Sequence, residues 1–160
     1  MRRDLIALPP DSKVWIYQAS QPVSHSDADI IKEEIYRFTM NWASHGHVLD
    51  CYGHLFHYQF LVLVADANSL PSGCSIDSSV HFVKAIGDKF KIDFFDRMQF
   101  AYLDGDHIAT LSSTRFKEAV SEGQINNDTL VFNNLVDNKS DFLENWIIPL
   151  QDSWHQKFVQ

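Results

Sequence analysis

The amino-acid sequence predicts an α+β fold with an antiparallel sheet, and three observations support this prediction. Short runs rich in β-branched and aromatic residues alternate with longer segments in which apolar residues recur every three or four positions. These segments begin in the order strand, helix, strand, strand, helix, strand. Asp104-Gly105 then separates two further short apolar runs, which is typical of a two-residue hairpin turn.

The first strand and the first helix are expected before residue 46. Val14 to Tyr17 is a β-branched and aromatic run, which favours a strand. Ser26 can cap a helix, because its side-chain oxygen can accept a hydrogen bond from the first turn. Apolar residues then follow at helical spacing and predict one buried stripe. The stripe consists of Ile31, Ile35, Phe38 and Trp42.

The remaining elements follow from the same two patterns. We expect a second helix that starts after its N-cap Ser75 and buries an apolar stripe up to Phe90. A shorter helix is expected at 114–121, ended by Gly123. The other expected elements are strands at 48–56, 60–65, 98–103, 108–111 and 129–136, and a helical turn at 141–146.

The order of the first six elements is that of a ferredoxin-like fold. Strands one and three are central in that fold, and the runs 15–17 and 60–65 are apolar on both faces, as central strands are. Asp50, Gly53 and His54 predict that the second strand is an edge strand. We therefore expect one domain over residues 1–160. It would comprise an N-terminal arm (1–13), a ferredoxin-like core (14–103) and a C-terminal extension (104–160) of β-hairpin, helix and strand.

The composition excludes several classes of function. The 160 residues carry a formal net charge of −8, which disfavours nucleic acid as a partner because phosphate binding needs Lys and Arg. No apolar run approaches the roughly 20 residues of a membrane helix, so no membrane insertion is expected. The apolar run near the N-terminus is too short for a signal peptide, so we expect a cytoplasmic protein with both cysteines reduced.

The best candidate for ligand binding is the small-residue segment that leads into the second helix. Backbone amides at a helix start can bind an anion, and a glycine lets a ligand approach the backbone closely. The alternative is that Ser75 only caps the helix while Asp77 complements its dipole. The candidate ligand-binding residues are Gly73, Cys74, Ser75, Asp77, Ser78 and Ser79.

Cys74 is also a candidate catalytic nucleophile. A helix N-terminus lowers the pKa of a thiol, and a Cys-dependent enzyme would further need a histidine base nearby. His54, His57 and His155 are the available partners. The alternative is a small buried thiol that packs beneath the loop.

A third candidate is a metal site in a histidine-rich segment. Imidazole and thiolate are zinc ligands, and residues two or four apart on a strand share a face. The spacing matches no standard zinc motif, so the alternative is a set of partly exposed histidines on an edge strand, and we expect no cofactor. The candidate ligands are His45, His47, Cys51, His54 and His57.

These patterns together favour a non-enzymatic domain that binds a protein or a small ligand around Gly73 to Ser79. A small Cys/His-dependent enzyme centred on Cys74 and a metal-binding domain are the alternatives. The C-terminus is apolar, with Trp146, Trp154 and Phe158. This segment either docks on the core or makes a homodimer contact.

Five segments also give the chain a family resemblance that spans nearly its whole length. They are Val14–Gln18, Ser72–Val80, Phe95–Arg97, Val131–Val136 and Asp152–His155. In these segments the chain resembles a little-characterised bacterial family commonly labelled "ABC transporter ATPase". That function requires a P-loop ending in Gly-Lys-Ser/Thr, and the chain has no Gly-Lys pair, so we expect no ATPase activity. Residues 116–131 resemble, over a short stretch, the helix-turn-strand of GYF-type peptide-binding modules.

Overall fold

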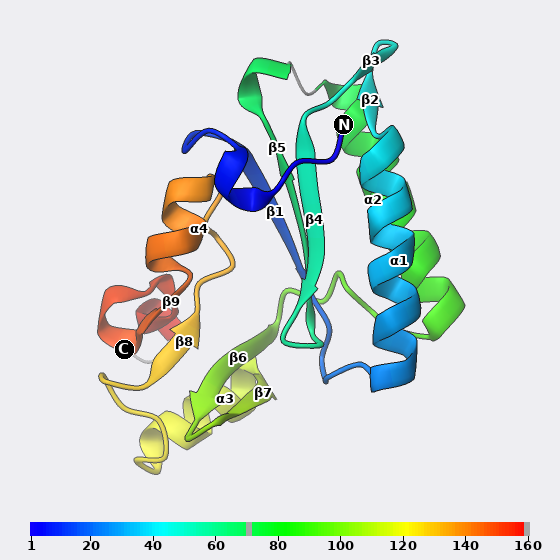
Figure 1. Cartoon of the computed structure of the whole chain (residues 1–160). Coiled ribbons are helices and arrows are strands. Elements are labelled where there is room, and N and C mark those ends of the chain that lie inside the picture. Colours follow the sequence, from blue (N-terminus) through cyan, green and yellow to red (C-terminus); the bar gives the residue numbers. More distant parts are fainter. Residues whose placement is uncertain (70–71, 159–160) are drawn as a thin grey trace. The chain divides into compact units, whose positions relative to one another are not determined.

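The computed structural model describes residues 1–69 and 72–158, and it is an α+β fold with antiparallel sheets, as predicted (Figure 1). The chain divides into two compact units, each with its own sheet. Unit 1 is Met1–Phe95 with Asp137–Ser140, and unit 2 is Asp96–Val136 with Asp141–Gln160. The boundary after Phe95 precedes the strand that was expected to complete the core.

Unit 1 holds a three-stranded sheet, a short hairpin and two long helices. The expected strand at 48–56 is divided between the hairpin and the edge of the sheet. The elements of unit 1 are η1 (Leu5–Ala7), β1 (Lys13–Gln18), α1 (His25–Asn41), β2 (Ala43–Ser44), β3 (His47–Val48), β4 (Cys51–Phe56), β5 (Phe60–Ala65), η2 (Ala67–Ser69) and α2 (Gly73–Phe90).

The sheet of unit 1 has the order β1-β5-β4, with both pairs antiparallel. Every residue of β5 from Phe60 to Ala65 has 0% of its surface exposed, because neighbouring strands and packed side chains enclose this strand. The predictions that β5 is central and that β4 is an edge strand are confirmed. The expectation of a central first strand is wrong: β1 lies at the other edge, where Val14 N–H donates to the Asp137 carbonyl at 3.0 Å.

Helix α1 begins two residues earlier than expected. Ser24, not Ser26, is its N-cap and accepts a hydrogen bond from Asp27 N–H at 3.2 Å. The helix packs closely over β4, because Gly53 has no side chain there. A Cβ at Gly53 would lie 2.7 Å from Cγ2 of Ile35, so this position requires glycine.

Helix α2 also begins earlier than expected, at Gly73. Its N-cap is Ser72, and Ser75 is the third helical residue of a capping box. The reciprocal bonds of that box satisfy two amides that a cap at Ser75 would leave without partners. α2 is 18 residues long. Across residues 1–69 and 72–158, no helix combines the length and apolar character needed to cross a membrane.

Both long helices pack on one face of the sheet in unit 1 and lie side by side (Figure 1). Ile31 and Ile35 of α1 and Val83 of α2 are all 0% exposed, and they share one core with Leu61 and Leu63 of β5. This shared core fixes the separation of the two helices, because protein interiors are close-packed.

Unit 2 holds a four-stranded antiparallel sheet of order β7-β6-β8-β9. Helix α3, expected at 114–121, is present, whereas the strand expected at 129–136 has only three residues. The elements of this part of the chain are β6 (Gln99–Asp104), β7 (His107–Ser112), α3 (Ser113–Ser121), β8 (Leu130–Phe132), α4 (Lys139–Asn145), β9 (Ile147–Pro149), η3 (Leu150–Asp152) and η4 (Trp154–Phe158).

The ferredoxin-like core is not confirmed, because its expected fourth strand belongs to the sheet of unit 2. β6 pairs with β7 along six residues, from Gln99 opposite Ser112 to Asp104 opposite His107, and it pairs with β8 on its other side. Because the turn at Gly105 is short, closing the β6–β7 hairpin costs little loop-closure entropy. Three strands and two helices of the expected core therefore remain in unit 1.

Candidate functional site

An open groove of about 650 Å³ lies between α1 and α2 in unit 1. Its volume is within the roughly 300–1,000 Å³ of small-ligand pockets. Most of the lining surface is apolar, and three of the lining residues are aromatic. The lining residues are Glu34, Arg37, Phe38, Asn41, Trp42, Ala43, Ser78 and Phe82.

The floor of the groove is a set of three aromatic rings. Phe38 of α1 stacks on Phe82 of α2, with ring centroids 4.3 Å apart and an interplanar angle of 8°. Phe38 also contacts Trp42, at 5.3 Å between centroids. Trp42 is fixed in place, because its indole N–H donates to the Ser75 carbonyl at 2.9 Å. The floor is therefore apolar and held from both helices.

Charged and amide side chains line the α1 side of the groove. Nη2 of Arg37 lies 2.7 Å from Oε1 of Glu33, and both side chains of this ion pair are well exposed. Glu34 pairs with Lys89 of α2. Exposed ion pairs contribute only about 0–1 kcal/mol, so these groups can exchange partners at little cost when a ligand binds. Asn41 donates to the Arg37 carbonyl and also lines the groove.

Of the six predicted ligand-binding residues, one reaches this groove. Ser78 is exposed on α2 and forms part of its lining, and its hydroxyl donates to the Ser75 carbonyl at 2.8 Å. Gly73, Cys74 and Asp77 are exposed in the first turns of the same helix. A Cβ added at Gly73 would meet no atom within 4 Å, so packing does not require glycine there.

The two other serines of the predicted site serve the helix itself. Ser75 is 0% exposed, and its hydroxyl donates to the Ser72 carbonyl at 2.8 Å while it accepts from Ser72 N–H at 2.7 Å. Ser79 is also 0% exposed and donates to the Ile76 carbonyl at 2.6 Å. Their burial leaves Ser78 as the serine of this segment that a ligand can contact from the groove.

Cys74 has an exposed thiol that makes no hydrogen bond within residues 1–69 and 72–158. The histidines proposed as its base have contacts of their own. His155 is 1% exposed, and its Nδ1 lies 2.6 Å from Oγ of Ser153. Burial lowers the pKa of His155 to about 4, so the ring is neutral near pH 7. His54 contacts Phe56, at 5.2 Å between ring centroids. His155 belongs to unit 2, and in the described part of unit 1 no hydrogen bond connects His54 or His57 to Cys74.

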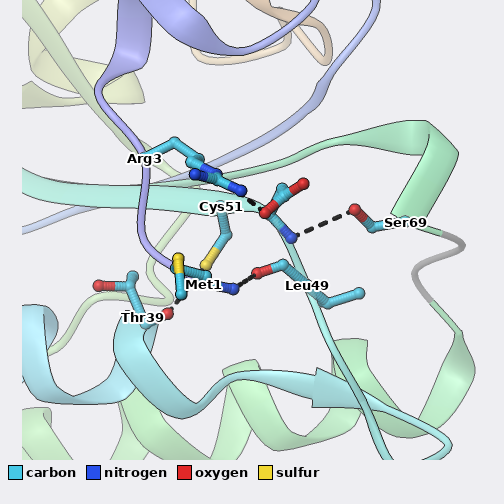
Figure 2. A network of polar contacts seen from close by, with 7 residues as sticks. Met1, Arg3, Thr39, Leu49, Cys51 and Ser69 are labelled. Atoms are coloured by element: carbon cyan, nitrogen blue, oxygen red, sulfur yellow. Dashed lines mark hydrogen bonds and ion pairs between the residues drawn. The ribbon is translucent and has the colours of Figure 1, made fainter.

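Cys51 is buried beneath the N-terminal arm (Figure 2). Its thiol donates to the Thr39 carbonyl at 3.1 Å, and its backbone N–H donates to the Met1 carbonyl at 3.1 Å. Arg3 extends this network through an ion pair with Asp50 at 3.0 Å. Burial raises the pKa of Cys51 to about 11, which disfavours the thiolate that a metal needs.

The structure does not bring the candidate metal ligands together. His45 and His47 are exposed in the β2–β3 hairpin, whereas Cys51 faces the core. His54 points to the opposite face of β4 from Cys51, because residues an odd number apart on a strand alternate. Within residues 1–69 and 72–158, no group of three or more His, Cys, Asp or Glu side chains could hold a metal ion.

The sequence analysis did not identify the groove. Phe38 and Trp42 were placed on the buried stripe of α1, and Phe82 was outside the predicted stripe of α2. The sequence did contain a signal for it. Two aromatic-rich helices each follow a strand of one sheet, and such helices pack side by side. No family model, curated protein or solved structure matches the chain, so the geometry alone supports the functional argument.

Proposed function

We propose that this protein is a non-enzymatic binding domain whose α1–α2 groove holds an apolar or aromatic side chain of a partner polypeptide. The observation that carries the proposal is the aromatic floor. Phe38 and Phe82 are only half-buried where they stack across the two helices. Burying such ring surface contributes about 25 cal/mol per Å², so a partner side chain gains free energy by covering it.

The shape and charge of the groove favour a polypeptide over a small ion. The groove is open and lies between two helices, an arrangement that accepts an extended or helical segment. Its floor has no ionisable group, which fits an apolar anchor. Arg37 and Glu34 bring both charge signs to the lining, where polar groups flanking that anchor can pair with them.

The predicted segment Gly73 to Ser79 enters this proposal through Ser78. Gly73, Cys74 and Asp77 are exposed in the first turns of the same helix and lie outside the groove lining. The ferredoxin-like relationship of unit 1, the cytoplasmic location and a homodimer remain predictions from the sequence. In a homodimer formed through this groove, a second copy of the chain would supply the side chain that fills it.

The proposal is tested by NMR titration of the ¹⁵N-labelled protein with N-acetyl-tryptophan amide and N-acetyl-leucine amide. We expect the amide resonances of Phe38, Asn41, Ser78 and Phe82 to shift together, with a dissociation constant of about 1–10 mM for so small a probe. If neither probe caused these shifts at about 50 mM, the result would contradict the proposal.

A matched pair of variants distinguishes the groove from general surface binding. Ser78→Trp places a large ring in the groove and should abolish the shifts. Asp77→Trp places the same ring on the neighbouring exposed position, outside the groove lining, and should leave the shifts in place. Equal loss in both variants would locate the binding elsewhere.

A further inference from the structure

The α1–α2 groove extends along its two helices for more than one turn. On the α1 side its lining includes Glu34, Phe38 and Trp42, each four positions after the last, so these side chains follow one another along one face. At 1.5 Å per residue they span about 12 Å. Ser78 and Phe82 of α2 are also four positions apart. An occupant that fills the groove therefore spans about two turns of a helix or about four residues of an extended segment.

The polar side chains that line the groove already have partners. The Asn41 side-chain amide donates to the Arg37 carbonyl at 3.0 Å, and the two charged side chains form the ion pairs described above. The Trp42 indole N–H and the Ser78 hydroxyl both donate to the Ser75 carbonyl, at 2.9 and 2.8 Å. The backbone N–H and C=O groups of the two helices bond within each helix. Among the residues that the structure describes, the lining therefore presents no row of unused donors and acceptors to an occupant.

These hydrogen bonds favour a helical occupant over an extended one. An extended segment carries N–H and C=O groups along both of its edges, and those that turn towards the aromatic floor would lose water without gaining a partner. A helix satisfies these groups internally and presents only side chains to the groove. The cost of burying backbone polar groups therefore distinguishes between the two kinds of segment.

The groove has two levels at which an apolar side chain can bind, one helical turn apart. At the first level, Phe38 stacks on Phe82. At the second level, Trp42 and Ser78 lie close together, since both donate to the Ser75 carbonyl. The step between the levels is four residues on each helix. Side chains four residues apart on a partner helix point the same way, so a helix with two such anchors matches both levels.

The charges of the lining favour a helix with both signs beside its apolar stripe. Glu34 and Arg37 lie three positions apart on α1 and bring one negative and one positive group to the groove. The present partner of Arg37, Glu33, is outside the lining, and the side chains of this pair are 70% and 65% exposed. So exposed a pair contributes little, and Arg37 can pair instead with a carboxylate of the occupant. Lys and Glu beside the stripe of an amphipathic helix complement both groups.

We infer, on the basis of the proposed function, that the segment bound in this groove is an amphipathic helix of a partner polypeptide. Its two apolar anchors are four residues apart, one over the Phe38–Phe82 stack and the other beside Trp42. It carries Lys and Glu next to these anchors. A helix of two to three turns is long enough to place both anchors.

The test compares three peptides of about 16 residues in an Ala-rich helical host, since shorter helices are marginal in water. The first has Trp and Leu four positions apart, with a Lys and a Glu beside them. The second has the same composition but places Trp and Leu two positions apart, on different faces of a helix. The third is the first with a Pro between its anchors, which disrupts the helix. Circular dichroism verifies the helicity of each peptide, and NMR of the ¹⁵N-labelled protein measures binding.

The first peptide should shift the amide resonances of Phe38, Asn41, Ser78 and Phe82. It should bind at least about tenfold more tightly than N-acetyl-tryptophan amide, because a second anchor is buried, and the other two peptides should lose this gain. Equal affinities of the first peptide and either of the others would overturn the helix inference. If N-acetyl-tryptophan amide binds in the groove but the first peptide binds no more tightly, the helix inference fails and the proposed function stands. If no probe shifts these resonances, both fail.

A matched pair of charge variants tests the position of the helix beside α1. The affinity of the first peptide is compared with that of a form in which its Glu is replaced by Lys. Arg37→Glu should shift the ratio of these affinities towards the Lys form by about two- to fivefold relative to the wild type, because both charges of the lining are then negative. Arg115→Glu makes the same change in net charge at an exposed residue of unit 2 and should leave the ratio unchanged. Equal shifts in the two variants would contradict a helix that lies along α1.

Discussion

The two units contain similar sets of aromatic rings that are used in different ways. In unit 2, Phe100 contacts Phe116, Trp154 and His155 at centroid distances of 5.4, 5.3 and 5.1 Å, and the η4 segment covers these rings. Phe116 is 0% exposed. In unit 1, the centroids of Phe38 and Phe82 are closer, at 4.3 Å, but both rings are only half-buried and line an open groove.

The comparison shows that an aromatic cluster is not by itself a sign of a binding site. In unit 2, Phe100 meets Phe116, Trp154 and His155 edge to face, as rings do in many protein interiors, and a segment of the same chain completes their burial. The Phe38–Phe82 stack has the same chemistry, but part of its surface stays open to a partner. The two clusters differ in whether a segment of the chain covers the rings, and three measurements test this difference.

The largest expected effect is that of Phe116→Ala, which should lower the free energy of unfolding by about 4 kcal/mol, because it removes a fully buried ring and leaves a cavity. Phe82→Ala should cost only about 1 kcal/mol, since that ring is half-exposed in the folded protein. Urea unfolding followed by circular dichroism measures both. Equal costs would mean that Phe82 is a core residue and that the groove is not a ready contact surface.

The next effect concerns the two thiols of unit 1. Cys51 is buried and Cys74 is exposed, so they show the same contrast as the two aromatic clusters. Cys51 should react with iodoacetamide at least about 100-fold more slowly than Cys74 in the native protein, because it is buried and its raised pKa of about 11 keeps it protonated. Peptide mapping by mass spectrometry gives both rates. Similar native rates would show that the N-terminal arm does not cover Cys51.

The rate of Cys74 also bears on the alternative of a Cys/His-dependent enzyme. A rate close to that of a free cysteine peptide would argue against a catalytic thiol, whereas a strongly accelerated rate would favour one. In urea the two cysteines should react equally, which provides the control for intrinsic reactivity.

The smallest effect is a loss of stability in acid that arises from the covered cluster of unit 2. The pKa of His155 is lowered from 6.5 to about 4 by burial, so the unfolded state binds more protons between these values. Its contribution is complete above pH 6.5 and is lost as the pH falls towards 4. We expect a loss of about 2 kcal/mol between pH 7 and pH 5. His54 adds to it, since its pKa is also lowered by burial.

Urea unfolding at the two pH values measures this loss. His155→Leu should remove most of the pH dependence whatever its effect on stability at pH 7, and His81→Gln, at an exposed position, should retain it. If the stability of His155→Leu still fell by the full amount between pH 7 and pH 5, another titrating group would be responsible.

Much of the local structure could be predicted from the sequence. The continuous apolar run of β5 predicted a central strand, because such a strand is buried on both faces. The spacing of Ile31 and Ile35 predicted the buried face of α1, because it matches the period of a helix. The caps were displaced by two or three residues, from Ser26 to Ser24 and from Ser75 to Ser72. Each of these stretches offers several serines, and the choice depends on reciprocal bonds that spacing does not reveal.

Less of the candidate site could be predicted. Ser78 was among the expected binding residues, but its neighbours Ser75 and Ser79 proved to be buried and hydrogen-bonded within α2. The groove depends on Phe38 and Phe82, which are 44 positions apart and meet only because two helices pack on one sheet. No local pattern encodes that contact.

The type of most secondary-structure elements, the α+β class and the acidic character of the chain could be predicted without the structure, since these follow from propensity, periodicity and composition. Packing determines which sheet β6 joins, which aromatic rings are covered and which of the two thiols is buried. The physical reason is that pairing, burial and electrostatic environment are properties of residues distant in sequence, and only the packed chain brings them within contact distance.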